Sequence, residues 1–230
     1  MKKKPKIFLA CDTSNIRFVR KIINSKKTND LEILLKFGLE FFYSKNGRKF
    51  ISKLKNEKIF LDLKLNDIPN TCLSAMSSLK DLRNISYITA HINGGYEMLK
   101  AVKKYSKKIN KNVKVLGVSI LTSLSKKSLK QIGHTKSIPS LIKKQAQLAK
   151  SAGLDGIVCS GHEIKYVQNI CKNMEIVVPG IRLKGDKSSD QKRVMTPKDA
   201  FKQGANAIVI GRSLTRGQIK NNIQKLIKSL

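Results

Sequence analysis

Short apolar runs, each about the length of one strand, alternate with amphipathic helical stretches along the whole chain. No linker and no low-complexity segment interrupts the alternation, which predicts parallel strands joined by helical crossovers. The predicted strands cover residues 7–12, 32–37, 58–65, 87–92, 114–121, 156–160, 175–181 and 207–212. The predicted helices cover residues 16–24, 41–55, 72–82, 96–109, 138–152, 163–171, 196–203 and 218–228.

Eight strand-helix units in 230 residues favour an α/β protein of the (β/α)8 TIM barrel type, with residues 1–230 forming one domain. A doubly wound open sheet normally has fewer strands and a glycine-rich first turn, and no G-x-G-x-x-G follows the first predicted strand. Barrel enzymes carry their chemistry at the carboxyl ends of the strands, so candidate residues are sought there.

The third predicted strand carries two charges on one face. In the run FLDLKL, period-two alternation directs Leu61, Leu63 and Leu65 toward the helices and places Asp62 and Lys64 on the inner face. Burying an ionised group costs free energy unless the group is paired with an opposite charge, and such groups are found at functional sites. These two residues are therefore candidates for catalysis or binding. A purely structural ion pair is the alternative.

The segment after this strand, NDIPNT, has the features of a helix start. Asp67 is followed by Pro69, which suits a capping carboxylate with proline in the first turn. Helix capping is therefore the structural alternative to a functional role for Asp67.

A phosphate site is predicted at the last two strands. Residues 182–190 are rich in Gly, Lys, Asp and Ser, as in a surface loop, and Arg212 follows Gly211 at the end of the eighth strand. Barrels often bind phosphate between the loops after strands seven and eight, where glycine permits close backbone approach and the arginine fork suits phosphate oxygens. An ordinary surface cation is the alternative for Arg212.

Several motifs, in chain order, resemble those of orotidine 5'-phosphate decarboxylases. FLDLKLNDIPNT is similar to the family's signature, with Asn66 where the family often has His. The likeness extends over essentially the whole chain through the segments LACD, LLKFGLEFF, HINGG, VSILTS, DGIVCSGHE and VVPGIRLKGDKSSDQKRVMTPKDAFKQGANAIVIGRSLT.

The resemblance implies roles for individual residues. It implies an alternating network of Lys36, Asp62, Lys64 and Asp67, in which Lys64 stabilises and protonates a ring carbanion. It also implies a homodimer in which Asp67, Ile68 and Thr71 complete the neighbouring site, and it implies no metal and no cofactor. The substrate-binding candidates are the ribose-binding Asp12, Lys36, Thr71, Ile68, Thr122, Pro179, Arg182, Gln191, Gly211 and Arg212. Lys184, His91 and Ser160 are left outside the site, the last two as packing residues.

The net charge of the chain indicates which classes of binding partner it could attract. The 47 Lys and Arg against 15 Asp and Glu give a formal charge of +32, which would attract nucleic acid, anionic lipid or phosphorylated metabolites. The lysines are spread through the chain without interleaved aromatics, so specific nucleic-acid binding is not expected, and an AT-rich genome would give the same composition.

The four cysteines lack C-x-x-C spacing, which argues against a disulfide framework or a zinc site. No apolar run approaches the roughly 20 residues of a membrane span, so a cytoplasmic protein is expected.

Two other functions remain open. A sister barrel enzyme uses a similar D-x-K-x-x-D strand with magnesium to act on sugar phosphates such as 3-keto-gulonate 6-phosphate or hexulose 6-phosphate, although the I-P-N-T and D-Q-K-R segments argue against it. A barrel converted to polyanion or RNA binding is the alternative from a different class, motivated by the charge.

Overall fold

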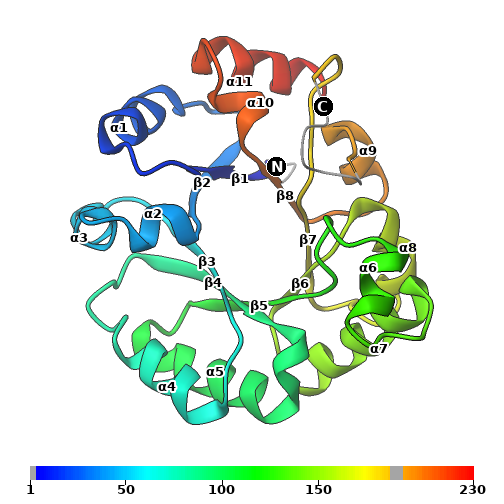
Figure 1. Ribbon diagram of the computed structural model, residues 1–230. Coiled ribbons are helices and arrows are strands. Elements are labelled where there is room, and N and C mark those ends of the chain that lie inside the picture. The colour runs from blue at the N-terminus through cyan, green and yellow to red at the C-terminus, as the bar shows by residue number, and fades with distance from the viewer. Residues whose placement is uncertain (1–3, 187–193) are drawn as a thin grey trace.

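The eight predicted strands form a closed parallel barrel, which confirms the predicted α/β class and TIM barrel. The computed structural model describes residues 4–186 and 194–230. The strands pair in chain order and β8 closes on β1, as Figure 1 shows in a view along the barrel. They are β1 (Lys6–Ala10), β2 (Glu32–Phe37), β3 (Ile59–Leu65), β4 (Ile85–His91), β5 (Lys114–Val118), β6 (Gly156–Val158), β7 (Glu175–Val178) and β8 (Ala207–Ile210).

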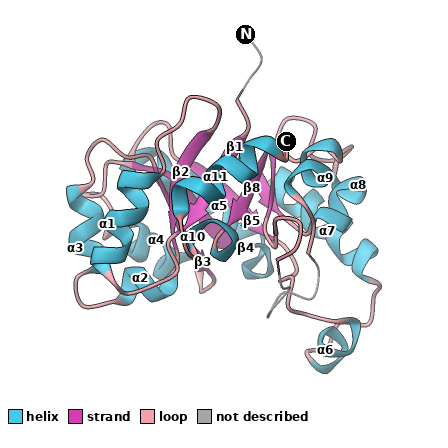
Figure 2. Ribbon diagram, turned by 90° about the horizontal axis from the view of Figure 1, so that it is seen from above, coloured by secondary structure: helices cyan, strands magenta, loops and turns pink. Residues whose placement is uncertain are grey.

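Helices surround the barrel, with the strands enclosed at the centre (Figure 2). They are α1 (Ile16–Ser25), α2 (Leu39–Tyr43), α3 (Gly47–Lys53), α4 (Pro69–Ser77), α5 (Gly95–Ile109), α6 (Lys126–Gln131), α7 (Ile138–Ser151), α8 (Ile164–Val167), α9 (Pro197–Lys202), α10 (Arg212–Thr215) and α11 (Ile219–Lys228), with the 3-10 turns η1 (Ile92–Gly94) and η2 (Gly161–Glu163). Within the described residues, no helix is long and apolar enough to span a bilayer.

Two apolar layers hold the barrel together. The larger lies between strands and helices and includes Leu61, with Leu63 and Leu65 packed against it, as the alternation predicted. The smaller fills the barrel interior, where the ring centroids of Phe8 and Phe60 are 4.7 Å apart. Because the interior is filled, inward side chains beyond Phe60 must lie at the mouth of the barrel.

The amino-terminal end of the barrel is closed by an internal polar cluster. Lys6 Nζ donates to the Tyr87 hydroxyl at 2.8 Å and lies 3.3 Å from a carboxylate oxygen of Glu175, which also pairs with Lys114. Burial, and then the nearby Glu175 carboxylate, raise the pKa of Tyr87, which keeps this phenol protonated. These groups therefore form hydrogen bonds and ion pairs with one another, at the end of the barrel opposite the predicted site.

The predicted helix over residues 41–55 is wrong: the chain forms α2 and α3 with a break between them. Ser44 has an extended backbone with ψ 152, and its hydroxyl donates to the Phe41 carbonyl at 2.7 Å. A Cβ on Gly47 would lie 1.6 Å from that carbonyl oxygen, so the close approach requires glycine. Helical periodicity did not reveal this turn, because both halves keep an apolar face.

Several predicted boundaries also change. β5 ends at Val118 and β8 at Ile210, before the predicted ends, because the residues beyond leave the ladder to line the mouth. α4 begins at Pro69, earlier than predicted, and α6 and α10 were not predicted.

Candidate active site

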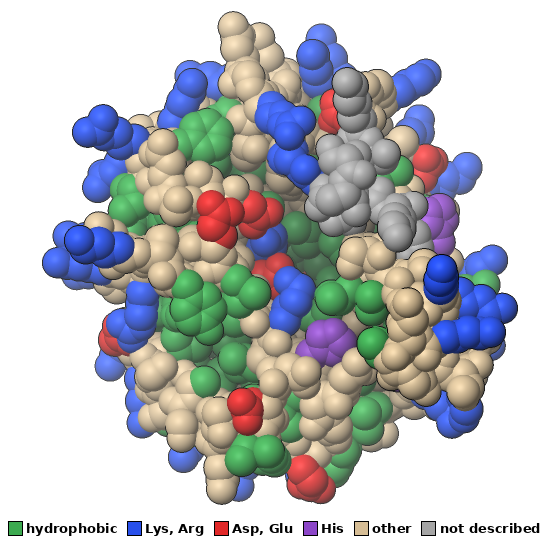
Figure 3. Space-filling model, viewed as in Figure 1, with side chains coloured by type: hydrophobic (Ala, Val, Ile, Leu, Met, Phe, Trp, Pro, Cys, Tyr) green, Lys and Arg blue, Asp and Glu red, His purple; other side chains and the backbone are tan. Residues whose placement is uncertain are grey.

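A cavity of about 690 Å³ opens at the carboxyl ends of the strands. In the space-filling view of the same face, acidic and basic side chains gather around the central hollow (Figure 3). Nine sequence-predicted site residues line this cavity: Asp12, Lys36, Asp62, Lys64, Thr122, Pro179, Arg182, Gly211 and Arg212. The lining also includes Thr13, Leu39, Ser123 and Gly180, which sequence reasoning missed although they follow predicted site positions closely in the chain.

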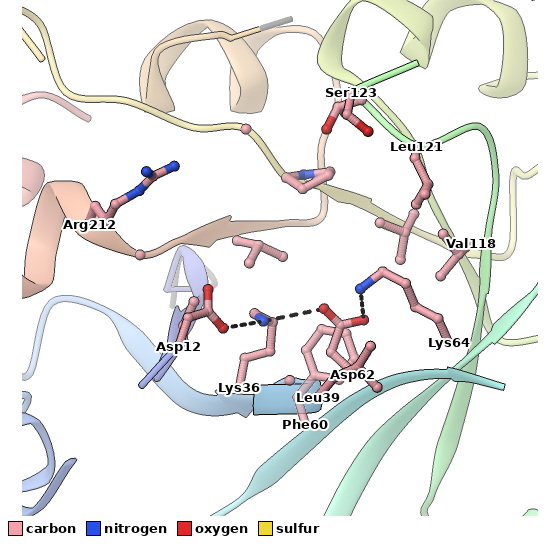
Figure 4. A pocket seen from close by; sticks show the side chains of 18 of the residues that line it. Asp12, Lys36, Leu39, Phe60, Asp62, Lys64, Val118, Leu121, Ser123 and Arg212 are labelled. Atoms are coloured by element: carbon pink, nitrogen blue, oxygen red, sulfur yellow. Dashed lines mark hydrogen bonds and ion pairs between the residues drawn. The ribbon is translucent and has the colours of Figure 1, made fainter. Parts of the chain in front are cut away.

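Four side chains of alternating charge form a continuous chain of ion pairs (Figure 4). Lys36 Nζ lies 3.1 Å from Asp12 Oδ1 and 3.3 Å from Asp62 Oδ2. Lys64 Nζ lies 2.9 Å from Asp62 Oδ1. The Lys36 and Asp62 side chains are 7% and 14% exposed, whereas those of Lys64 and Asp12 are 34% and 59% exposed, so the two central members are buried and the two outer members open to the mouth.

Strand register explains this order. Ala10, Lys36 and Phe60 lie opposite one another in neighbouring strands. Asp12 and Asp62 each follow by two positions, so both carboxylates belong to the inner face one level nearer the mouth. The long side chain of Lys36 then extends upward between them.

The ion pairs set the charge states of the two buried members. Burial alone would lower the pKa of Lys36, but the carboxylates of Asp62 and Asp12 outweigh it, so its pKa lies above the ordinary value. Burial alone would raise the pKa of Asp62, but the ammonium groups of Lys36 and Lys64 outweigh it, so its pKa lies below the ordinary value. Both groups are therefore ionised at neutral pH.

His91 lies at the end of β4, close enough to the ion pairs for the charge of Lys64 to act on it. Burial and then the charge of Lys64 lower its pKa, which favours a neutral imidazole, and its Nδ1 accepts from the Asn93 backbone N–H at 3.4 Å. Ser160 is fully buried, and its backbone N–H donates to Glu163 at 3.1 Å. Neither residue lines the cavity, consistent with the packing roles predicted for them.

The predicted phosphate side of the cavity brings together the ends of β7 and β8. Arg212 is the first residue of α10 instead of the last of β8, and it still lines the cavity. A Cβ on Gly211 would meet Ala10 Cβ at 3.3 Å and Asp12 Oδ2 at 3.9 Å, so this position packs closely against β1. Gln191 lies outside the described residues.

Asp67, Ile68 and Thr71 are exposed and do not line the cavity of their own chain. Asp67 Oδ1 accepts from the Ile68 backbone N–H at 2.7 Å. The capping alternative for Asp67 is wrong, because the N-cap of α4 is Ile68 and no side chain caps that helix. The predicted proline in the first turn is present as Pro69.

The described residues contain no group of three or more His, Cys, Asp or Glu side chains arranged to hold a metal ion. The four cysteines are buried and form no disulfide bond with one another. The polar groups of the cavity are thus its ammonium, guanidinium, carboxylate and hydroxyl side chains.

A parallel barrel with a charged cavity at the carboxyl ends of its strands defines this protein as a (β/α)8 barrel enzyme. The model of the Orotidine 5'-phosphate decarboxylase / HUMPS family matches residues 5–223, and the chain belongs to that family. This confirms the resemblance found in the sequence motifs.

Individual relatives agree with the family. The chain is 41% identical over 216 residues to the orotidine 5'-phosphate decarboxylase of Carboxydothermus hydrogenoformans, covering 91% of this chain and 88% of that protein. It is 40% identical over 232 residues to that of Buchnera aphidicola, covering 98% and 96%. A crystal structure of the enzyme from Lactobacillus acidophilus superposes with a TM-score of 0.83 at 32% identity, covering 99% of each chain.

Proposed function

We propose that this enzyme decarboxylates orotidine 5'-phosphate to uridine 5'-phosphate, the last step of de novo pyrimidine nucleotide synthesis. The observation that carries the proposal is the chain of alternating charges from Asp12 through Lys36 and Asp62 to Lys64 at the mouth of the barrel. The relatives named above support the same substrate.

The reaction requires a group that stabilises negative charge on the ring carbon and then donates a proton to that carbon. When the bond between the ring carbon and the carboxylate breaks, carbon dioxide leaves and the electron pair stays on the ring carbon, in an orbital that cannot delocalise into the π-system. The Lys64 ammonium stabilises that charge and transfers its proton to the carbon. Of the two lysines, Lys64 is the more exposed, at 34% against 7% for Lys36, as this contact requires.

Asp62 and Lys36 hold Lys64 in place and set the field around it. Asp62 lies near the departing carboxylate, and two like charges about 4 Å apart at an effective dielectric near 20 repel by only about 4 kcal/mol. Enzymes commonly lower activation barriers by about 8–23 kcal/mol. The repulsion between the two carboxylates is therefore too small to account for the whole rate acceleration. Preorganised stabilisation by Lys64 supplies much of the remainder, without a metal or coenzyme.

The other side of the cavity binds the nucleotide. Arg212 and the backbone at Gly211 bind the phosphate, Asp12 the ribose, and Pro179 lies near the base, with Thr122 beside the reacting carboxylate. Arg182 adds a cation near the phosphate. For Gln191, which lies outside the described residues, the family resemblance implies binding of both phosphate and pyrimidine. Binding energy from the phosphate is then available for orienting the ring over Lys64.

An absorbance assay of orotidine 5'-phosphate consumption, without added metal and with a chelator, tests this function. We expect turnover that the chelator does not reduce. Turnover that requires magnesium, or activity only on hexulose 6-phosphate or 3-keto-gulonate 6-phosphate, would assign the protein to the other branch of the family. A salt-dependent RNA gel shift without decarboxylase activity would favour the polyanion-binding alternative.

We also propose a homodimer in which Asp67, Ile68 and Thr71 complete the neighbouring site. These side chains are exposed, and Ile68 is an apolar residue with 66% of its surface accessible. Contiguous exposed apolar surface is typical of interfaces, and in the proposed dimer Ile68 forms part of such a surface. Within its own chain, Asp67 does not line the cavity, and we propose that it reaches Lys64 of the second subunit instead.

Mixing two inactive variants tests the shared site. Lys64→Ala and Asp67→Ala homodimers are each expected to be inactive. After the subunits exchange, a hybrid dimer has one site with both residues intact, so about a quarter of the wild-type activity is expected to return. No recovery despite mass-spectrometric proof of hybrids would contradict the arrangement.

We also propose that the enzyme acts in the cytoplasm. Phosphorylated substrate and product carry charges that do not cross a bilayer readily, so an enzyme of nucleotide synthesis belongs in the compartment that makes and uses them. Cell fractionation followed by the absorbance assay would test this.

A further inference from the structure

Lys64 has an unusual backbone conformation. Its φ is 51°, and it is the only non-glycine residue with positive φ in the described parts of the chain. This left-handed conformation is unfavourable for a lysine and persists only where neighbouring groups enforce it. The pairing of β3 with β4 also shifts register between Leu61 and Leu65, so the strand around Lys64 does not follow a regular ladder.

Thr89 in β4 makes the contacts that accompany this distortion. The Lys64 backbone N–H donates to Thr89 Oγ1 at 2.8 Å. The same hydroxyl donates to Asp62 Oδ1 at 3.1 Å. Thr89 is 0% exposed, so water does not compete for either bond.

These contacts close a ring of interactions around the proposed proton donor. Asp62 Oδ1, which accepts from Thr89, is also the oxygen 2.9 Å from Lys64 Nζ. One hydroxyl is therefore tied to the backbone of Lys64 and, through Asp62, to its ammonium. Only a group that both accepts and donates a hydrogen bond can do this, and a hydroxyl does so with a single atom.

We propose that Thr89 is a positioning residue for catalysis, which fixes Lys64 and Asp62 relative to each other and to the substrate. The proposal rests on the role of Lys64 given under the proposed function. The branched side chain of threonine restricts χ1, which aims the hydroxyl at both partners. Its sequence signal is weak, because threonine is common in strands and Thr89 stands 25 residues from Lys64.

Loss of the hydroxyl should affect the chemical step more than binding. Without it, the Lys64 N–H is left without its partner and Asp62 loses one of the donors that orient it. Displacing a catalytic group by about 1 Å can cost roughly 100-fold in rate. Thr89 does not line the cavity, so the phosphate side, formed by residues after β7 and β8, should keep its shape.

Thr89→Val and Thr89→Ser test the proposal. Valine keeps the shape and removes the hydroxyl, and we expect kcat to fall about 10- to 100-fold with KM changed less than about threefold. Serine keeps the hydroxyl, and we expect it to retain kcat within about threefold of wild type. Ser106→Ala is the matched control, because Ser106 is also fully buried and its hydroxyl bonds only to the Lys103 carbonyl within its own helix, α5.

Three results would overturn the inference. Folded Thr89→Val with wild-type kcat would do so, as would Thr89→Ser losing as much kcat as Thr89→Val. If Thr89→Val does not fold, Thr89→Ala replaces it, and activity lost only in proportion to unfolded protein would reduce Thr89 to a structural residue. Lys64→Ala in the same assay separates the two proposals: if it is inactive while Thr89→Val is normal, only the positioning role fails.

Discussion

Lys36 and Asp62 form a largely buried ion pair at the base of the cavity, with 3.3 Å between Nζ and Oδ2. Their side chains are only 7% and 14% exposed, so each charge depends on the other for stabilisation. Asp62 also pairs with Lys64, and Lys36 with Asp12, so the buried pair is the centre of a longer chain.

Asp62→Asn is expected to destabilise the fold. The substitution leaves the buried Lys36 ammonium with only the more exposed Asp12, and removing one partner of a buried pair costs about 3 kcal/mol or somewhat more. Asp81→Asn is the control, because the Arg48–Asp81 pair has side chains 43% and 51% exposed and should contribute less than about 1 kcal/mol. Urea unfolding measures both, and equal losses would contradict the prediction.

The pH dependence of that difference follows from the pKa shifts. The pKa of Asp62 is lowered in the fold, so its contribution is present above its unfolded value of about 3.9 and is lost as pH falls through the folded value. The pKa of Lys36 is raised, so its contribution is full below about 10.4 and is lost only as pH rises through the folded value.

The stability difference between wild type and Asp62→Asn should therefore stay constant from about pH 5 to about pH 9 and shrink below about pH 4. Urea unfolding at a series of pH values measures it. A difference that already disappears between about pH 6 and 8 would mean that another group, such as His91, controls the pair.

Lys64→Ala is expected to abolish turnover while binding of uridine 5'-phosphate remains measurable. The substitution removes the proton donor but leaves the phosphate side of the cavity intact. Steady-state kinetics and calorimetric titration with the product measure the two effects. Near-normal turnover would end the assignment of Lys64.

Arg212→Ala is expected mainly to weaken phosphate binding. Hydrogen bonds to charged groups contribute about 1.5–3 kcal/mol, which corresponds to a KM raised roughly 10- to 100-fold. Arg216→Ala is the control, since Arg216 is exposed and does not line the cavity. An unchanged KM in Arg212→Ala, or an equal rise in both variants, would count against the role of Arg212.

Much of the site could be predicted from strand periodicity. Alternation in FLDLKL placed Asp62 and Lys64 on the inner face, and the structure has both lining the cavity. It succeeded because side-chain direction in a strand depends on local backbone geometry alone. The motifs also indicated Asp12, Lys36 and Arg212, which line the same cavity.

Side-chain spacing failed where the local path of the backbone decides the outcome. The break between α2 and α3 depends on the fit of Gly47 against the Phe41 carbonyl, which helical spacing does not encode. Asp67 had the pattern of a helix cap, yet Ile68 takes that position. In both cases sequence periodicity was compatible with more than one backbone path.

The sequence by itself determined the order of the eight strands, the inward-facing charges of β3 and the family. Only the tertiary structure decided that Lys36 lies between Asp12 and Asp62, and that Thr89 bridges Asp62 and the backbone of Lys64. The partners of Lys36 stand 24 and 26 positions away in the chain. Such contacts depend on the register between strands and on closure of the barrel, which are set by packing of the whole molecule.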